Sequence, residues 1–289
     1  MSVEVIVVDD GSSEQPPDRL GDGDPRLRIV RLPERRGVAA ARNAGIAVAC
    51  GEWIAFLDDD DTWSPRKLRT QLDTADREAA DVVYAGVVSV GEDGRARYAF
   101  PLPEPDGLRR RLLTASLLPA GCSNVIARAE LVRALGGFDE DLHQLADWDL
   151  WLRLAWAGRI AACDEILTAY LEHDQNMLLS DPGDVTLELE HLERKHRQLR
   201  AAEGVALDRA AFAHWVAWGH LRRRRRLRAA AVYLRSGLRN RRLGDLYLAA
   251  AFVTRAALPV VRLARAWPRG GSSSVPPPPV QPDWLGVQR

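Results

Sequence analysis

Four aspartates at positions 58–61 directly follow an apolar, strand-like segment at residues 53–57. Carboxylates this close together repel one another unless a cation neutralises them, so the run predicts a binding site for a divalent metal ion. A metal ion held in this way can also carry the phosphates of a ligand. The chemistry that these residues indicate is metal-dependent transfer from a phosphorylated donor.

A second acidic pair, Asp9 and Asp10, ends another apolar segment at residues 3–8. Both apolar segments have the length and composition of buried strands. If the two strands are parallel, their carboxyl ends lie on one edge of the sheet, where open α/β folds bind ligands. We therefore expect the two acidic clusters to contribute to one site.

The elements that must position these carboxylates alternate between strand-like and helix-like segments. Residues 27–32 and 82–90 have the pattern of strands, whereas residues 36–49 and 65–77 have the pattern of helices. This alternation predicts an α/β protein with a largely parallel sheet. A chain of 289 residues with 46% hydrophobic content is large enough for one main domain and an extension.

Five segments occur in an order and spacing that resemble those of the family 2 glycosyltransferases. They are VIVVDDGS at residues 5–12, RGVAAARNAG at 36–45, GEWIAFLDDDDTW at 51–63, GGFDEDL at 136–142 and DWDLWLRL at 147–154. The resemblance covers roughly residues 3–180 and implies an inverting enzyme that uses a nucleotide-sugar donor. It also implies a GT-A type (Rossmann-like) fold, an α/β architecture with a mostly parallel sheet flanked by helices, followed here by a C-terminal helical extension.

The resemblance assigns the donor side of the site residue by residue. Asp10 matches the aspartate that binds the nucleotide base, with a turn-capping role as the alternative. Arg42 would help to neutralise the donor phosphates, unless it is a solvated helix arginine. Asp58, Asp59 and Asp60 match the DxD motif that holds Mg²⁺ or Mn²⁺ and the ribose, and Asp60 is the expected direct metal ligand. The fourth aspartate of the run is expected only to cap the following helix.

On the acceptor side, inverting transfer needs a general base that takes the proton of the acceptor hydroxyl. Asp147 is the expected catalytic base, although Ala146 stands where family members often carry a further acidic residue, and Asp149 is the fallback. The alternative for Asp147 is a charge that interacts with the helix dipole. His173 matches a family histidine and is expected to bind the metal or the diphosphate, with a structural role as the alternative.

Family members begin with a strand and a helix that precede the VIVVDDGS strand. We therefore expect residues 1–184 to form a GT-A-like domain that is short at its N-terminus and weakly active or inactive. A noncatalytic nucleotide-sugar-binding module is one alternative. The other is a Mg²⁺-dependent phosphatase of haloacid dehalogenase type, whose DxDxT pattern Asp58, Asp60 and Thr62 would match.

The formal net charge of zero is the sum of two regions of the sequence with opposite net charges. Residues 1–189 carry a net charge of −14, and residues 190–289 carry +14. Residues 185–267 have helical periodicity and include an arginine run at positions 222–226, which favours either docking on an anionic membrane or packing on the acidic domain. No nucleic-acid-binding motif accompanies this charge, so nucleic acid is not an expected partner.

Residues 268–289 are rich in proline and serine and are expected to be a disordered tail. The three cysteines are far apart and are expected to be reduced thiols, and the N-terminus shows no secretory pattern. We therefore expect a cytoplasmic protein, peripheral at the inner face of the membrane. Its expected acceptor is a saccharide or a lipid-linked molecule used in cell-surface polysaccharide or glycolipid synthesis.

Overall fold

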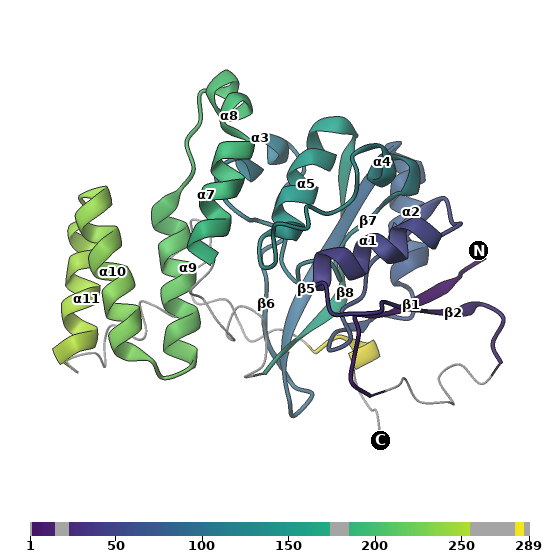
Figure 1. Cartoon of the computed structure of the whole chain (residues 1–289), viewed down its shortest axis with the longest axis horizontal. Coiled ribbons are helices and arrows are strands. Elements are labelled where there is room, and N and C mark those ends of the chain that lie inside the picture. The colour runs from purple at the N-terminus through teal and green to yellow at the C-terminus, as the bar shows by residue number, and fades with distance from the viewer. Residues whose placement is uncertain (1, 15–22, 174–184, 255–280, 286–289) are drawn as a thin grey trace.

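The computed structural model describes residues 2–14, 23–173, 185–254 and 281–285 (Figure 1). The strands are β1 (Val5–Asp9), β2 (Leu27–Arg31), β3 (Trp53–Ala55), β4 (Thr62–Trp63), β5 (Val82–Gly91), β6 (Ala96–Ala99), β7 (Ile126–Arg128) and β8 (Ile160–Glu172). The helices of the N-terminal region are α1 (Val38–Val48), α2 (Lys67–Glu78), α3 (Leu108–Leu112), α4 (Ala129–Ala134) and α5 (Ala146–Ala157). They are followed by α7 (Val185–Lys195), α8 (Arg197–Glu203), α9 (Arg209–Arg222), α10 (Arg226–Asn240), α11 (Leu243–Thr254) and the 3-10 helix η1 (Asp283–Leu285).

The strands form a mixed sheet rather than the mostly parallel sheet that we expected. Its order is β3-β7-β5-β8-β4, with β6 added beside β5. Among the strands that the structure describes in this sheet, only β5 and β8 pair parallel, and the short strands β3, β4, β6 and β7 pair antiparallel. A separate parallel pair consists of β1 and β2. The α/β class and the flanking helices agree with the prediction.

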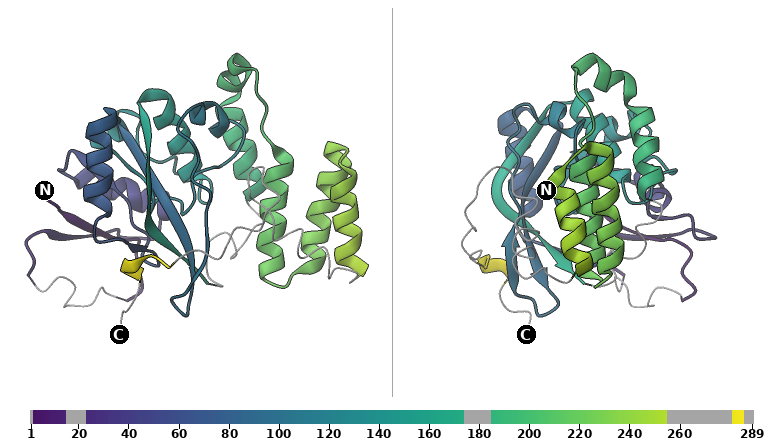
Figure 2. Two further views of the ribbon diagram at one scale, coloured as in Figure 1. Left: turned by 180° about the vertical axis from the view of Figure 1, so that it is seen from behind. Right: turned by 90° about the vertical axis from the view of Figure 1, so that its left-hand side faces the viewer.

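The fully buried strand β5 divides the core into two layers. Val82 and Tyr84 face a large cluster that includes residues of α1, α3 and α5, whereas Val83 and Ala85 face a smaller cluster with α2. This division follows from strand geometry, because successive side chains point to opposite faces. Helices therefore cover both faces of the sheet (Figure 2).

The long strand β8 was not expected from the sequence. Its parallel register with β5 shifts around Gly86, opposite the charged pair Asp164 and Glu165. A Cβ atom at Gly86 would lie 2.8 Å from the Glu165 carbonyl oxygen, so only glycine fits this irregularity without displacing the backbone. The strand then resumes its pairing and ends at Glu172, which places His173 beyond the end of β8.

The C-terminal helices fall into two packing groups. Val185, Leu189 and Leu192 of α7 are buried in the same core as α5. The last turns of α9 pack instead with α10 and α11 in a second core, and these two helices stand apart from the sheet (Figure 1). The helical prediction for residues 185–267 agrees with the structure up to residue 254. The predicted domain boundary between residues 184 and 185 lies at the edge of a segment, residues 174–184, that is outside the described residues. No helix of the described ranges is long and apolar enough to cross a membrane.

A short part of the C-terminal tail is ordered and returns to the sheet. Trp284 of η1 donates a hydrogen bond from Nε1 to the Ile166 carbonyl oxygen at 3.2 Å. Trp284 and Leu285 pack against a small cluster of buried residues, Val88, Val90 and Ala169. The prediction of a disordered tail over residues 268–289 therefore does not hold for these positions, because an apolar pair within the tail finds a matching face on β5 and β8.

Candidate active site

Two of the residues expected to bind metal lie side by side. Asp60 follows β3 and His173 follows β8, and the distance from His173 Nε2 to Asp60 Oδ2 is 2.9 Å. Both side chains are partly exposed. A carboxylate oxygen and an imidazole nitrogen are ligands that Mn²⁺ and similar divalent ions accept, so this pair suits a metal site open to solvent.

Next to this pair, α1 contributes the expected phosphate-binding arginine. Arg42 donates a hydrogen bond from Nη2 to Asp58 Oδ1 at 2.5 Å, and its guanidinium lies 5.4 Å from the centre of the Phe138 ring. Asp58 is also held through its backbone amide, which donates to Ser123 Oγ at 3.0 Å. Asp59 is exposed in the turn that follows β3. Arg42 therefore faces the acidic cluster rather than open solvent.

The expected catalytic base lies at the start of α5. Asp147 is half-buried, and its Oδ1 accepts a hydrogen bond from the Trp148 backbone amide at 2.6 Å. Burial raises the pKa of Asp147 to about 6, and the negative charge of Asp58 acts in the same direction while Arg42 opposes it. Asp147 is therefore electrostatically linked to the Arg42–Asp58 pair, and its carboxylate has the proton affinity that general base catalysis near neutral pH requires.

The fallback base, Asp149, is engaged elsewhere. Its carboxylate is fully buried and accepts hydrogen bonds from Arg153 and Lys195, and it also lies 2.7 Å from His196 Nε2. Burial alone would raise the pKa of Asp149, but the His196 hydrogen bond and the two positive charges hold it well below its usual value. A buried carboxylate with these partners is not available to an acceptor, so the structure favours Asp147.

Asp10 is in place at the end of β1 but has protein partners. Its two carboxylate oxygens accept hydrogen bonds from the backbone amides of Arg36 and Gly37, both at 2.8 Å. These amides precede the first turn of α1, so Asp10 fixes the loop that leads to Arg42. The geometry gives Asp10 a local structural role, and the nucleotide-binding role stays a prediction.

Two further residues have contacts at the site, namely Asp61, which we expected only to cap the following helix, and Ser123, to which we assigned no role from the sequence. Asp61 Oδ1 accepts a hydrogen bond from the Leu171 amide at 3.1 Å, which ties the aspartate turn to the strand that leads to His173. Burial raises the pKa of Asp61 to about 7. Ser123 accepts from the Asp58 amide and, through its carbonyl oxygen, from Trp63 Nε1 at 2.7 Å. A serine or an aspartate in a loop has no sequence pattern that would mark such tertiary contacts.

The chain thus combines a mixed sheet, helices on both of its faces and an acidic turn after β3. Residues 1–135 match the family model "Glycosyl transferase family 2". This N-terminal part, somewhat less than half of the chain, therefore resembles glycosyltransferase family 2 in sequence. Asp147 and His173 lie beyond the matched residues, so their roles do not follow from this match.

Curated relatives carry glycosyltransferase or polysaccharide-biosynthesis names. The chain is 40% identical over 131 residues to the succinoglycan biosynthesis protein ExoO of Rhizobium meliloti. The aligned region is 45% of this chain and 36% of ExoO. It is 28% identical over 207 residues to the uncharacterized glycosyltransferase YwdF of Bacillus subtilis, and the alignment covers 68% of this chain and 74% of YwdF. The pre-mycofactocin glycosyltransferase of Mycobacterium tuberculosis is 33% identical over 188 residues, with 61% and 38% covered. The chain thus spans little more than a third of two of these relatives.

Among solved structures, the chain resembles S. aureus TarS, residues 1–349, in its complex with UDP-GlcNAc. The TM-score is 0.51 at 20% sequence identity, and the alignment covers 91% of this chain and 78% of the TarS chain. At this level of identity the similarity concerns the fold, and it confirms the GT-A prediction.

Proposed function

We propose that this protein transfers a sugar from a nucleoside-diphosphate sugar to an acceptor hydroxyl, with inversion at the anomeric carbon and with the help of a divalent metal ion. The observation that carries the proposal is the pairing of Asp60 with His173 next to the Arg42–Asp58 ion pair. Together these groups offer ligands for a cation and a positive charge for phosphate within one site. Asp147 is close enough to this site for the charges of Arg42 and Asp58 to act on its pKa.

The residues at the end of β3 and β8 fit Mg²⁺ or Mn²⁺. Asp60 and His173 would hold the ion, because their oxygen and nitrogen atoms are partly exposed and close enough to share it. When bound, the ion supplies Lewis-acid stabilisation of the charge on the departing diphosphate.

The other groups act on the donor and the acceptor. Arg42 exchanges part of its interaction with Asp58 for the donor phosphates, while Asp10, Asp58 and Asp59 orient the nucleoside. Asp147 takes the proton of the acceptor hydroxyl as the oxygen attacks the anomeric carbon and the bond to the nucleoside diphosphate breaks. A single displacement of this kind inverts the anomeric configuration.

The printed names of relatives suggest a substrate class. TarS has been solved with UDP-GlcNAc, and ExoO is named for succinoglycan biosynthesis. We therefore favour a UDP-sugar donor and a saccharide or lipid-linked acceptor in the synthesis of a cell-surface polysaccharide. The same names favour the transferase over the phosphatase that the DxDxT pattern allowed.

We also place the protein in the cytoplasm, peripheral to the inner face of the membrane. On α10, Leu227 and Leu238 are 71% and 67% exposed, and Leu243 at the start of α11 is 82% exposed. An exposed arginine follows or precedes each of these leucines in the sequence. Exposed apolar side chains flanked by positive charges favour the interface of an anionic bilayer.

Two experiments test these points. The full chain should release nucleoside diphosphate from one of a panel of UDP-, GDP- and dTDP-sugars when Mn²⁺ is present, and EDTA should abolish that release. No release from any donor with any oligosaccharide acceptor would contradict the transferase.

The chain should co-sediment with vesicles that contain phosphatidylserine and not with pure phosphatidylcholine vesicles, and replacing Leu227 and Leu238 by serine should weaken that binding. Equal behaviour with both vesicle types would contradict membrane docking.

A further inference from the structure

A buried glutamate of α7 holds the backbone that leads into α5. Glu188 Oε2 accepts hydrogen bonds from three consecutive backbone amides, those of His143 at 3.1 Å, Gln144 at 2.8 Å and Leu145 at 3.0 Å. Glu188 itself is only 6% exposed. Backbone amides that precede a helix need partners when they are buried, and a single carboxylate supplies all three here.

The position of these amides matters because α5 begins immediately after them. Leu145 is the N-cap of α5, and Asp147 is the second residue of the helix. The side chain of the N-cap residue makes no capping hydrogen bond. The carboxylate of Glu188 therefore holds the N-cap amide and the two amides before it. Its negative charge also suits the positive end of the helix dipole. The residue that fixes where α5 starts lies more than forty positions further along the chain.

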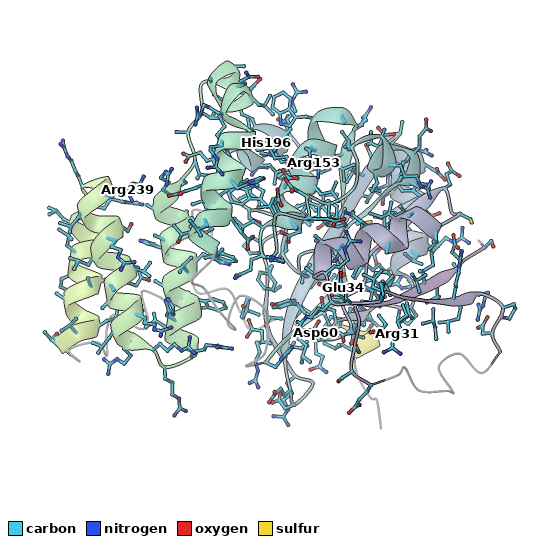
Figure 3. All side chains as sticks on the ribbon, viewed as in Figure 1. Arg31, Glu34, Asp60, Arg153, His196 and Arg239 are labelled. Carbon is cyan, nitrogen blue, oxygen red and sulfur yellow. The ribbon has the colours of Figure 1, made fainter. Side chains whose placement is uncertain are left out.

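A second contact fixes α5 two residues beyond Asp147. Asp149 is bound by Lys195 and His196, which lie at the junction of α7 and α8, and by Arg153 of α5 itself. Arg153 also donates to the Gly137 carbonyl oxygen at 2.7 Å. Figure 3 shows Arg153 and His196 beside one another where α5 meets the C-terminal helices.

We propose that Glu188 is a positioning residue for the base Asp147, and that α7 and the start of α8 are a required part of the transferase site. This inference rests on the proposed function, in which Asp147 deprotonates the acceptor. Residues of α7 and of the α7–α8 junction form hydrogen bonds with the backbone at residues 143–145 and with the side chain of Asp149. These contacts flank Asp147 and so fix the position and direction of its carboxylate. A base displaced by about 1 Å can lose on the order of 100-fold in rate while substrates still bind.

The test compares Glu188→Gln with Glu190→Gln, because Glu190 is an exposed residue of the same helix. Each full-length variant is assayed for Mn²⁺-dependent UDP binding by calorimetry and for turnover of the donor identified in the panel above. We expect Glu188→Gln to lower kcat by about 10- to 100-fold and to leave the Kd for UDP within about twofold. Glu190→Gln should match the wild type in both measurements.

A purely structural role would give a different pattern, in which kcat and the number of UDP sites fall in the same proportion as folded protein is lost. If Glu188→Gln does not fold, the comparison is made with Glu188→Asp, which keeps the charge on a shorter side chain. Its kcat should be lower than that of the wild type, with unchanged UDP affinity. A wild-type kcat in the folded Glu188 variant would overturn the inference, provided that Asp147→Asn is inactive. If the wild type itself turns over no donor, the proposed function fails and the inference falls with it.

Discussion

His173 Nε2 lies 2.9 Å from Asp60 Oδ2, although the two residues are 113 positions apart in the chain. One follows β8 and the other follows β3, which are separated in the sheet by β7 and β5. The Asp61–Leu171 hydrogen bond joins the same two segments. The end of β8 is therefore joined to the aspartate turn, and a metal ion bound by Asp60 would have an imidazole beside it.

Replacing His173 by alanine should weaken metal binding without disturbing the fold. The side chain is 19% exposed and follows the last residue of β8, so we expect its loss to cost some stability without changing the arrangement of the sheet. We expect the Mn²⁺ concentration that half-saturates UDP binding to rise about tenfold or more, because one of the proposed ligands is lost. Calorimetric titration of UDP at a series of Mn²⁺ concentrations measures this shift. Asp73→Asn, an exposed substitution on α2, serves as control, and an unchanged Mn²⁺ requirement in His173→Ala would remove His173 from the site.

Turnover should depend on the ionisation of Asp147. Burial raises the pKa of this carboxyl to about 6, so the ionised form that can accept a proton is present above that pH and is lost below it. With donor and metal saturating, we expect kcat to fall as pH decreases through 6 and to be about tenfold lower at pH 5 than on the plateau. A kcat that stays flat from pH 7 to pH 5 would show that a group with a lower pKa, or no titrating base, limits turnover.

Lys67 should make the stability of the protein depend on pH in a defined direction. The side chain is fully buried, its Nζ donates to Gln71 Oε1 at 2.6 Å, and it lies 4.2 Å from the Trp63 ring centre. Burial lowers the pKa of Lys67 from 10.5 to about 7. The unfolded chain therefore binds one more proton than the folded chain between these values, and stability from this group rises with pH by up to about 1.4 kcal/mol per unit.

The Lys67→Met variant removes the titrating group while keeping an unbranched apolar side chain. Urea unfolding at pH 7.5 and pH 9 should show a smaller rise in the free energy of unfolding for the variant than for the wild type. The variant should also be at least as stable as the wild type at pH 7.5, because the free-energy cost of deprotonating and burying the amine has been removed. An equal rise with pH in both proteins would mean that Lys67 titrates normally in the folded state.

The sequence could predict those parts of the fold whose signals are local. The apolar segment before the four aspartates became β3, and residues 82–90 became most of β5, because both are short apolar runs that end at polar or glycine positions. β8 was missed because Asp164 and Glu165 interrupt its apolar pattern, and the bulge that accommodates them depends on Gly86 in another strand. Strand direction was wrong for a similar reason, since pairing partners are set by tertiary packing and not by the strand itself.

The candidate site shows the same difference between residues with a local sequence signal and residues placed by tertiary packing. Asp60, Arg42 and His173 were predicted from their motifs, and the structure places Asp60 beside His173 and Arg42 beside Asp58. Their roles in catalysis stay predictions. Glu188 has no motif, and it looks like any charged residue on an amphipathic helix until α7 is packed against the start of α5. Such contacts over long sequence separations have no local signal.

Asp60 and Asp147 are proposed to have separate tasks, so the most direct measurement compares Asp60→Ala and Asp147→Asn for UDP binding with Mn²⁺ and for donor turnover. We predict that Asp60→Ala loses both metal-dependent UDP binding and turnover. Asp147→Asn should bind UDP with a Kd within about twofold of the wild type and lose at least about 100-fold in kcat, since a general base contributes on that scale. Full turnover by both variants would contradict the assigned chemistry.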